Sequence, residues 1–264
     1  MKLNFKFYPK EELTPSVKSQ NLIILHGLFG SSKNWVSVSK FLSKYYNVYS
    51  LDLRNHGDSP HSEVHSIESM STDLEEFIQD HSLKDVSLLG HSMGGLVAMY
   101  FDLTHPGLLT SLIIQDISPR DYPFIYEKEV ESMSQDISES KSRSEIDSQM
   151  ATYVPDTFIR QFLQMNLERS PEGKYYWKLN VRGISKARKL FSEIFYGLPK
   201  SDTISLFVLG GASEYIRPED HKTIENFYKK SLLKTIEGGG HYIHFTHALE
   251  FTKILEDFVN SIRN

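Results

Sequence analysis

The chain has 264 residues, of which 39% are hydrophobic and 24% charged, so it has the composition of a globular protein with a sizeable core. Its net charge of −5 is small, and we therefore expect no nucleic-acid partner and no polybasic membrane patch. Cysteine is absent, which excludes a disulfide framework and thiolate metal sites and is compatible with a reducing compartment.

The first residues predict a strand. Residues 1–8 alternate polar and apolar side chains and lack the apolar stretch of a signal peptide, and a turn is expected at residues 9–15. No apolar run in the chain approaches a membrane-spanning length. We therefore expect a cytoplasmic protein with no membrane insertion.

Strands and helices then alternate along the chain. Short apolar runs predict strands at residues 21–25, 47–53, 86–89, 111–117, 203–209 and 231–236. Helical spacing of apolar residues follows most of these runs, over residues 34–44, 66–80, 95–101 and 218–229, and again in the closing stretch 251–262. This alternation predicts an α/β fold, with a mostly parallel sheet covered by helices on both faces.

The alternation stops between Pro119 and about Pro199. The patterns here predict helices at residues 126–133, 144–151, 157–167 and 184–195, and the segment is rich in aromatic residues. Because it follows a strand end, it is expected to lie over the carboxyl edge of the sheet. We predict a core of residues 1–118 and 200–264 with a helical cap of residues 119–199, whose aromatics mostly form the cap's own core.

One strand-to-helix turn carries the clearest chemical motif. Gly90-His91-Ser92-Met93-Gly94 follows an apolar strand and precedes a helix, the context of a nucleophile elbow. The flanking glycines are needed because a Cβ there would collide with the neighbouring strand or helix. We predict Ser92 as the nucleophile, whereas the neighbouring His91 is expected to point away from it.

A serine nucleophile needs a base and an acid. His241 follows a strand and three glycines late in the chain, which makes it the best candidate base. A metal site of His241, His244 and His247 is the alternative, but matching carboxylates are lacking, and we predict no metal. Two acids are possible: Asp116 ends the strand after the nucleophile helix, and Glu214 follows a later strand.

The oxyanion formed during attack needs fixed N–H donors. Met93, the residue after the nucleophile, is expected to supply one, and Leu28 in the glycine-containing loop 26–32 the other. The side chain of His26 is expected to brace that loop. Arg54, His56 and Asp58 either hold their own turn together or lie in a solvated loop.

The chain resembles the α/β-hydrolase superfamily, and more narrowly the YbfF-type esterases and related abhydrolase-domain proteins. The motifs that carry the resemblance are His26–Trp35, Asp52–His61, Gly90–Gly95, Asp116–Pro119 and Ser213–Tyr215. The resemblance implies an esterase or thioesterase with a helical cap, acting on simple esters or acyl-CoA-like substrates. It also implies a catalytic tetrad of Ser92, Asp116, His241 and Ser213, which favours Asp116 over Glu214 as the acid.

The residues predicted to bind substrate are Tyr215, Phe29 and Arg120. Tyr215 follows from the resemblance, whereas the cap arginine of the family does not line up cleanly: Arg120 comes slightly earlier, and Ile125 stands near the expected position.

Together these patterns predict a serine hydrolase that cleaves carboxylic esters or thioesters through an acyl-enzyme, without a cofactor and with no obligate protein partner evident. A carbon–carbon bond hydrolase or lactone hydrolase on the same scaffold is an open alternative. A non-catalytic binding protein on a retained hydrolase fold is another.

Overall fold

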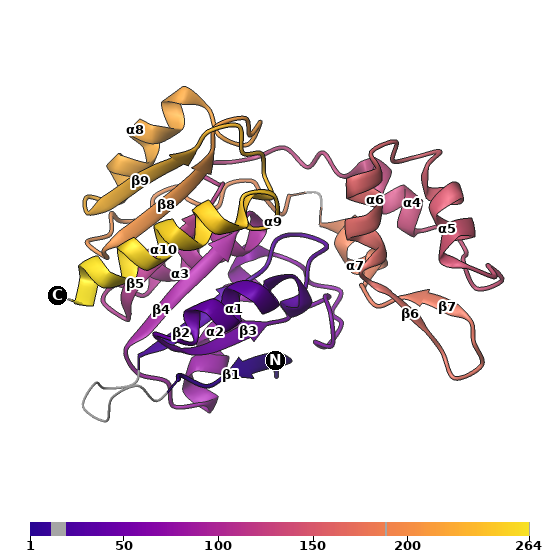
Figure 1. Ribbon diagram of the computed structural model, residues 1–264, viewed down its shortest axis with the longest axis horizontal. Coiled ribbons are helices and arrows are strands. Elements are labelled where there is room, and N and C mark those ends of the chain that lie inside the picture. The colour runs from indigo at the N-terminus through magenta and orange to yellow at the C-terminus, as the bar shows by residue number, and fades with distance from the viewer. Residues whose placement is uncertain (12–19, 188, 264) are drawn as a thin grey trace.

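The computed structural model describes residues 1–11, 20–187 and 189–263, and part of the turn expected at residues 9–15 lies outside this range. Its main feature is a seven-stranded sheet in the order β1-β3-β2-β4-β5-β8-β9 (Figure 1). The strands are β1 (Phe5–Tyr8), β2 (Asn21–Leu25), β3 (Asn47–Leu51), β4 (Val86–His91), β5 (Leu109–Gln115), β8 (Ser205–Gly210) and β9 (Ser231–Ile236).

The sheet is mostly parallel, as the alternation of elements predicts. β1 pairs antiparallel with β3, and the other neighbouring pairs are all parallel. The carboxyl ends of β4, β5, β8 and β9 therefore meet at one edge. The residues that directly follow these strands lie together there although they are far apart in the sequence.

Alternate side chains of each strand enter two different cores, because successive residues of a strand point to opposite faces. Ile23 and Leu25 pack in the core that contains α2 (Ile67–Asp80), α3 (Met93–Thr104) and α8 (Pro218–Phe227). Leu22 and Ile24 pack on the other face, with η1 (Ser32–Trp35), α1 (Val36–Leu42), α9 (Ile243–Thr246) and α10 (Ala248–Arg263). Within the described residues, no helix is long and apolar enough to cross a membrane.

Residues 119–199, which we call the insertion, contain α4 (Glu127–Met133), α5 (Arg143–Met150), α6 (Thr157–Gln164) and α7 (Val181–Lys186). The insertion is not wholly helical, because β6 (Leu167–Arg169) and β7 (Tyr175–Trp177) form an antiparallel hairpin. A Pro171-Glu172-Gly173 turn with φ of +84° at the glycine joins them. Such a turn beside aromatic residues is a hairpin signal that the helical prediction overlooked.

The helix predicted at residues 184–195 is also wrong, because α7 ends at Lys186. The described residues after it form turns, and their apolar side chains are buried, including Leu190, Phe191 and Ile194. The Phe191 carbonyl accepts a hydrogen bond from the Tyr122 N–H at 2.9 Å. Tertiary contacts of this kind outweigh the local helical pattern.

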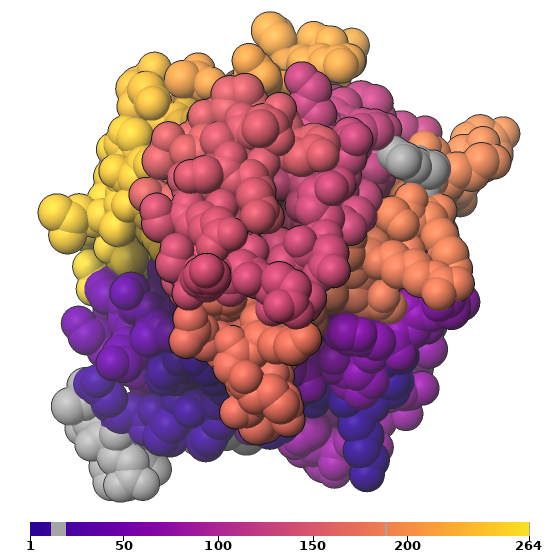
Figure 2. Space-filling model, turned by 90° about the vertical axis from the view of Figure 1, so that its right-hand side faces the viewer, coloured from indigo at the N-terminus to yellow at the C-terminus, as the bar shows by residue number. Residues whose placement is uncertain are grey.

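The insertion lies beside the core at the end of the sheet where α9 begins (Figure 1). Viewed from that side, it covers the centre of the molecule's face (Figure 2). Hydrogen bonds hold it to the core: Asn166 Nδ2 donates to the Phe29 carbonyl at 2.7 Å, and Asn180 Nδ2 donates to Asn55 Oδ1 at 2.9 Å.

Candidate active site

Ser92 occupies a strained turn between β4 and α3. Its backbone has φ of 52° and ψ of −120°, a conformation that costs energy for a residue with a side chain. A Cβ at Gly90 would lie 2.4 Å from the Gly94 carbonyl oxygen, and one at Gly94 would lie 2.3 Å from the Leu25 carbonyl oxygen. The two glycines therefore let the turn pass against its own helix and the neighbouring strand.

Asp116, which is fully buried, pairs with the partly buried His241 beside this turn. Asp116 follows β5, His241 follows β9, and 2.6 Å separates Asp116 Oδ2 from His241 Nδ1. The carboxylate also accepts hydrogen bonds from the Ser213 hydroxyl at 2.5 Å and from the Gly210 N–H at 2.7 Å. With Nδ1 bound to the carboxylate, Nε2 is the imidazole nitrogen left to exchange a proton.

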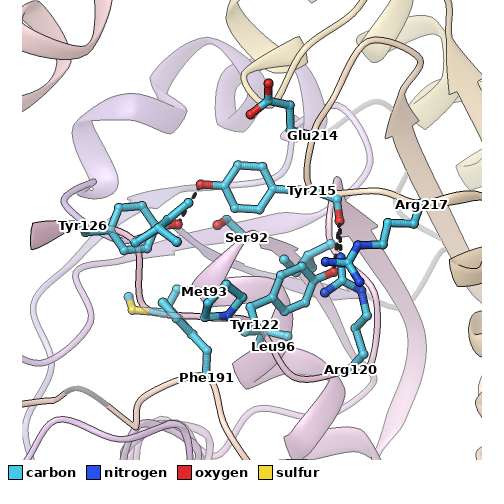
Figure 3. Close-up of a pocket in the computed structure, with 13 residues that line it drawn as sticks. Ser92, Met93, Leu96, Arg120, Tyr122, Tyr126, Phe191, Glu214, Tyr215 and Arg217 are labelled. Carbon is cyan, nitrogen blue, oxygen red and sulfur yellow. Dashed lines mark hydrogen bonds between the residues drawn. The ribbon is translucent and has the colours of Figure 1, made fainter. Parts of the chain in front are cut away.

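Tyr215 covers the imidazole of His241. The two rings stack with centroids 3.7 Å apart and planes 16° apart. The Tyr215 hydroxyl is 2.8 Å from the hydroxyl of Tyr126, a residue of the insertion, above Ser92 (Figure 3). Glu214, the second candidate acid, points its carboxylate away from Ser92 in the same view.

Hydrogen bonds of His26 and His56 hold the loop after β2 in place. His26 Nδ1 lies 2.8 Å from the Gly27 carbonyl oxygen, and His26 Nε2 accepts the Leu53 N–H at 3.0 Å. The Phe29 N–H donates to His56 Nε2 at 3.1 Å, at a residue whose φ is 63°. These bonds fix the backbone on both sides of Leu28, whose N–H is one of the two predicted oxyanion donors.

The turn after β3 is tightly bound at the buried Arg54 and His56, whereas the side chain of Asp58 is exposed. Arg54 makes a bidentate pair with Asp73, at 2.6 and 2.7 Å. Burial favours a raised pKa for Asp52, yet hydrogen bonds from the Asp58 and Ser32 N–H groups lower it below its usual range. Asp58 pairs with Lys178 of the insertion, so this turn also anchors the insertion.

Two more histidines support the site in their neutral form. His91, predicted to point away from Ser92, has its ring 4.6 Å from that of His241, and its Nε2 is 3.0 Å from the His241 carbonyl oxygen. Burial lowers the pKa of His91 well below its ordinary value, and that of His244 to about 3. His244, in the first turn of α9, stacks on Trp35 and binds Gln115. Among the described residues, no cluster of His, Asp and Glu is arranged to hold a metal ion.

Ser92 opens into two cavities. The first, of about 140 Å³, extends along α3 and the insertion, between Met93, Leu96 and Phe191. The second, of about 170 Å³, is lined by Leu28, His241 and side chains of α4 and α6. The two cavities adjoin, because four residues line both of them: Ser92, Ile125, Tyr126 and Tyr215.

Arg120 lies at the far end of the first cavity (Figure 3). Its Nε donates to the buried Asp220 at 2.8 Å, a terminal nitrogen donates to the Tyr215 carbonyl at 3.0 Å, and its guanidinium lies 3.7 Å from the ring centre of Tyr122. Phe29 lines the second cavity, and Tyr215 lines both. The binding of substrate by these three residues stays a prediction.

Comparisons with known proteins agree with this architecture. A family model described as the alpha/beta hydrolase fold matches residues 20–248. The chain belongs to the α/β-hydrolase family. This α/β-hydrolase is 34% identical over 254 residues to the sn-1-specific diacylglycerol lipase ABHD11 of Danio rerio, covering 91% of the chain and 78% of the relative.

Two further matches place the α/β-hydrolase among its relatives. An abhydrolase domain-containing protein of Schizosaccharomyces pombe is 31% identical over 260 residues, which are 92% of this chain and 93% of that protein. The structure of a marine microorganism esterase superimposes with a TM-score of 0.90 at 37% identity, covering 97% of this chain and 98% of the other. The protein is an ester-hydrolysing enzyme of the carboxylesterase type.

Sequence patterns missed three residues of the site. Tyr126 bonds to Tyr215, Asp220 pairs with Arg120, and Glu129 of α4 lines the second cavity. Each meets the site through a contact between distant segments, and no local motif marks any of them.

Proposed function

We propose that this enzyme hydrolyses carboxylic esters through an acyl-enzyme, with Ser92 as the nucleophile, His241 as the base and Asp116 as the acid. The hydrogen bond of 2.6 Å between Asp116 and His241, next to the strained Ser92 turn, is the main support. The carboxylate holds the proton on Nδ1, so that Nε2 can accept the proton of the Ser92 hydroxyl.

The reaction then proceeds in two steps. Ser92 Oγ attacks the ester carbonyl, and the N–H groups of Leu28 and Met93 stabilise the negative oxygen that forms. His241 returns the proton to the leaving alcohol, which departs and leaves the acyl group on Ser92. Water, deprotonated by His241, attacks this acyl-enzyme, releases the acid and restores the serine.

Ser213 completes the arrangement as a positioning residue. Its hydroxyl donates to the same carboxylate oxygen that binds His241, and it accepts the Tyr215 N–H at 3.2 Å. This hydrogen bond holds the carboxylate oxygen in the position from which it binds the imidazole during the reaction.

The insertion is proposed to act as a cap that selects substrates. It contributes Ile125, Tyr126 and Phe191 to the first cavity, whose lining is mostly apolar. We assign this cavity to the acyl chain and the second, which His241 lines, to the leaving group, because the leaving oxygen must receive its proton from His241.

Carboxylic esters with apolar acyl chains are the proposed substrates, in line with the diacylglycerol lipase among the relatives. Thioesters, including acyl-CoA, react through the same steps and are the finer proposal. A graded series of p-nitrophenyl esters and acyl-CoAs, compared by kcat/KM, separates the two classes and also reports chain length.

The nucleophile is tested directly by covalent labelling. A fluorophosphonate should add once to the protein, on Ser92, as shown by intact mass and peptide mapping. Ser92→Ala should fold normally, because the change is small, yet lose several orders of magnitude in kcat. A Ser92→Ala variant that retains the wild-type rate, or a label on another residue, would refute the proposal.

A further inference from the structure

One carboxylate of the second cavity has no role in the proposed chemistry. Glu129 lies in the first turn of α4 and lines this cavity together with Leu163, Tyr242 and His241. Its Oε2 is inaccessible to solvent and has no hydrogen-bond partner among the described residues. A buried carboxylate oxygen without a donor is costly, and Glu129 lines a cavity next to the proposed nucleophile, so its carboxylate points to a ligand that supplies a donor.

The surroundings of Glu129 make a charged, unpaired carboxylate unfavourable. Burial raises the pKa of the Glu129 carboxyl, and a hydrogen bond from its own backbone N–H opposes this rise. The negative charge of Glu127 adds to the rise, whereas Lys128 opposes it. The nearby hydroxyl of Tyr126 is already 2.8 Å from that of Tyr215. The rest of the cavity wall around α6 is apolar, with Ile159, Phe162 and Leu163.

The position of Glu129 indicates which part of a substrate it would meet. His241 lines the same cavity, and the leaving oxygen takes its proton from His241. The carboxylate of Glu129 therefore faces the alcohol part of an ester rather than its acyl chain. This step rests on the proposed function.

We propose that Glu129 is a specificity residue that hydrogen-bonds a hydroxyl group on the leaving alcohol. The substrates favoured by this site are esters of polyols, in which a second hydroxyl stands a few bonds from the ester oxygen. A site built around such a hydrogen bond discriminates strongly against an analogue that lacks the hydroxyl, because the buried polar group is then left unpaired.

The test compares two esters of equal size, 2-hydroxyethyl butyrate and propyl butyrate, which differ only by a hydroxyl in place of a methyl group. We expect the wild-type enzyme to favour the hydroxyethyl ester in kcat/KM by about tenfold or more, after division by the ratio of their alkaline hydrolysis rates. Glu129→Leu should reduce this preference to about one. Glu129→Gln, which retains a hydrogen-bonding side chain, should keep part of it.

Glu131→Leu is the matched control, because Glu131 is exposed on the same helix, and this variant should keep the wild-type preference. A wild-type enzyme without preference, or a preference that survives in Glu129→Leu, would overturn the inference. A fall in kcat/KM by the same factor on both esters in Glu129→Leu would also overturn the inference. None of these results affects the labelling of Ser92, so the failure of this inference is distinct from a failure of the proposed function.

Discussion

The aromatic ring of Tyr215 lies flat on the imidazole of His241, with centroids 3.7 Å apart. Tyr215 also donates its backbone N–H to Ser213 Oγ, and its hydroxyl is hydrogen-bonded to the hydroxyl of Tyr126. Tyr215 thus links the imidazole, the hydroxyl bound to Asp116 and the insertion. Its ring restricts how the imidazole can rotate, which matters because small misplacements of a base are costly.

Tyr215 variants separate the stack from the hydroxyl. Tyr215→Phe keeps the ring over His241 and should retain kcat within about threefold on p-nitrophenyl butyrate. Tyr215→Ala removes the ring and should lower kcat by about 10²-fold, since the imidazole is then free to leave its productive orientation. Equal kcat values for the two variants would show that the stack does not position His241.

The two candidate acids are distinguished by amide substitutions. Asp116→Asn keeps the shape but favours the wrong histidine tautomer, and should lower kcat by up to ~10⁴. Glu214→Gln should stay within about tenfold of the wild type, because its carboxylate points away from Ser92 (Figure 3). Circular dichroism and steady-state kinetics on both variants are sufficient, and the reverse pattern in two folded variants would make Glu214 the acid.

The cap role of the insertion is tested at Ile125, which lines both cavities and is 58% exposed. Ile125→Trp should narrow the entrance, with little cost in stability at an exposed position. We expect kcat/KM on p-nitrophenyl decanoate to fall about tenfold or more while that on p-nitrophenyl acetate changes less than threefold. Losses of the same size on both esters would argue against selection by the insertion.

Arg120 and Asp220 should contribute chiefly to stability. Arg120→Ala leaves the fully buried Asp220 carboxylate without its ion-pair partner, and we expect this to lower the free energy of unfolding by about 3 kcal/mol. Adding Asp220→Asn should restore much of this loss, as measured by urea unfolding of the single and double variants. If the Arg120→Ala variant is as stable as the wild type and only its KM is raised, the main role of Arg120 is substrate binding.

His65 should make the protein sensitive to acid. Burial lowers the pKa of His65 from its ordinary value of about 6.5 to about 3. Between these two pH values the unfolded chain binds a proton that the folded chain does not. The free energy of unfolding therefore falls as the pH falls, by about 1.4 kcal/mol per pH unit for this group. We expect the free energy of unfolding, measured by urea unfolding between pH 7 and pH 5, to change less steeply with pH in His65→Gln than in the wild type. The same substitution at the exposed His61 is the control, and identical slopes in wild type and His65→Gln would contradict the expectation.

The sequence by itself determined the layout of the sheet and the Ser92 turn. Period-two and helical apolar patterns depend on which faces are buried, and Gly90 and Gly94 are required by contacts within a few residues and one neighbouring strand. Parallel strands bring their carboxyl ends to one edge, so the positions of Asp116 and His241 on that edge follow from the order of strands and helices alone.

Only the tertiary structure decided what those residues touch there. Asp116 rather than Glu214 meets His241, Arg120 pairs with a residue 100 positions later, and Tyr126 reaches across to Tyr215. Residues 167–177 became a hairpin and residues 189–195 turns, because burial against the rest of the insertion outweighs weak local preference. Patterns in a chain report local geometry, whereas contacts between distant segments depend on packing of the whole molecule.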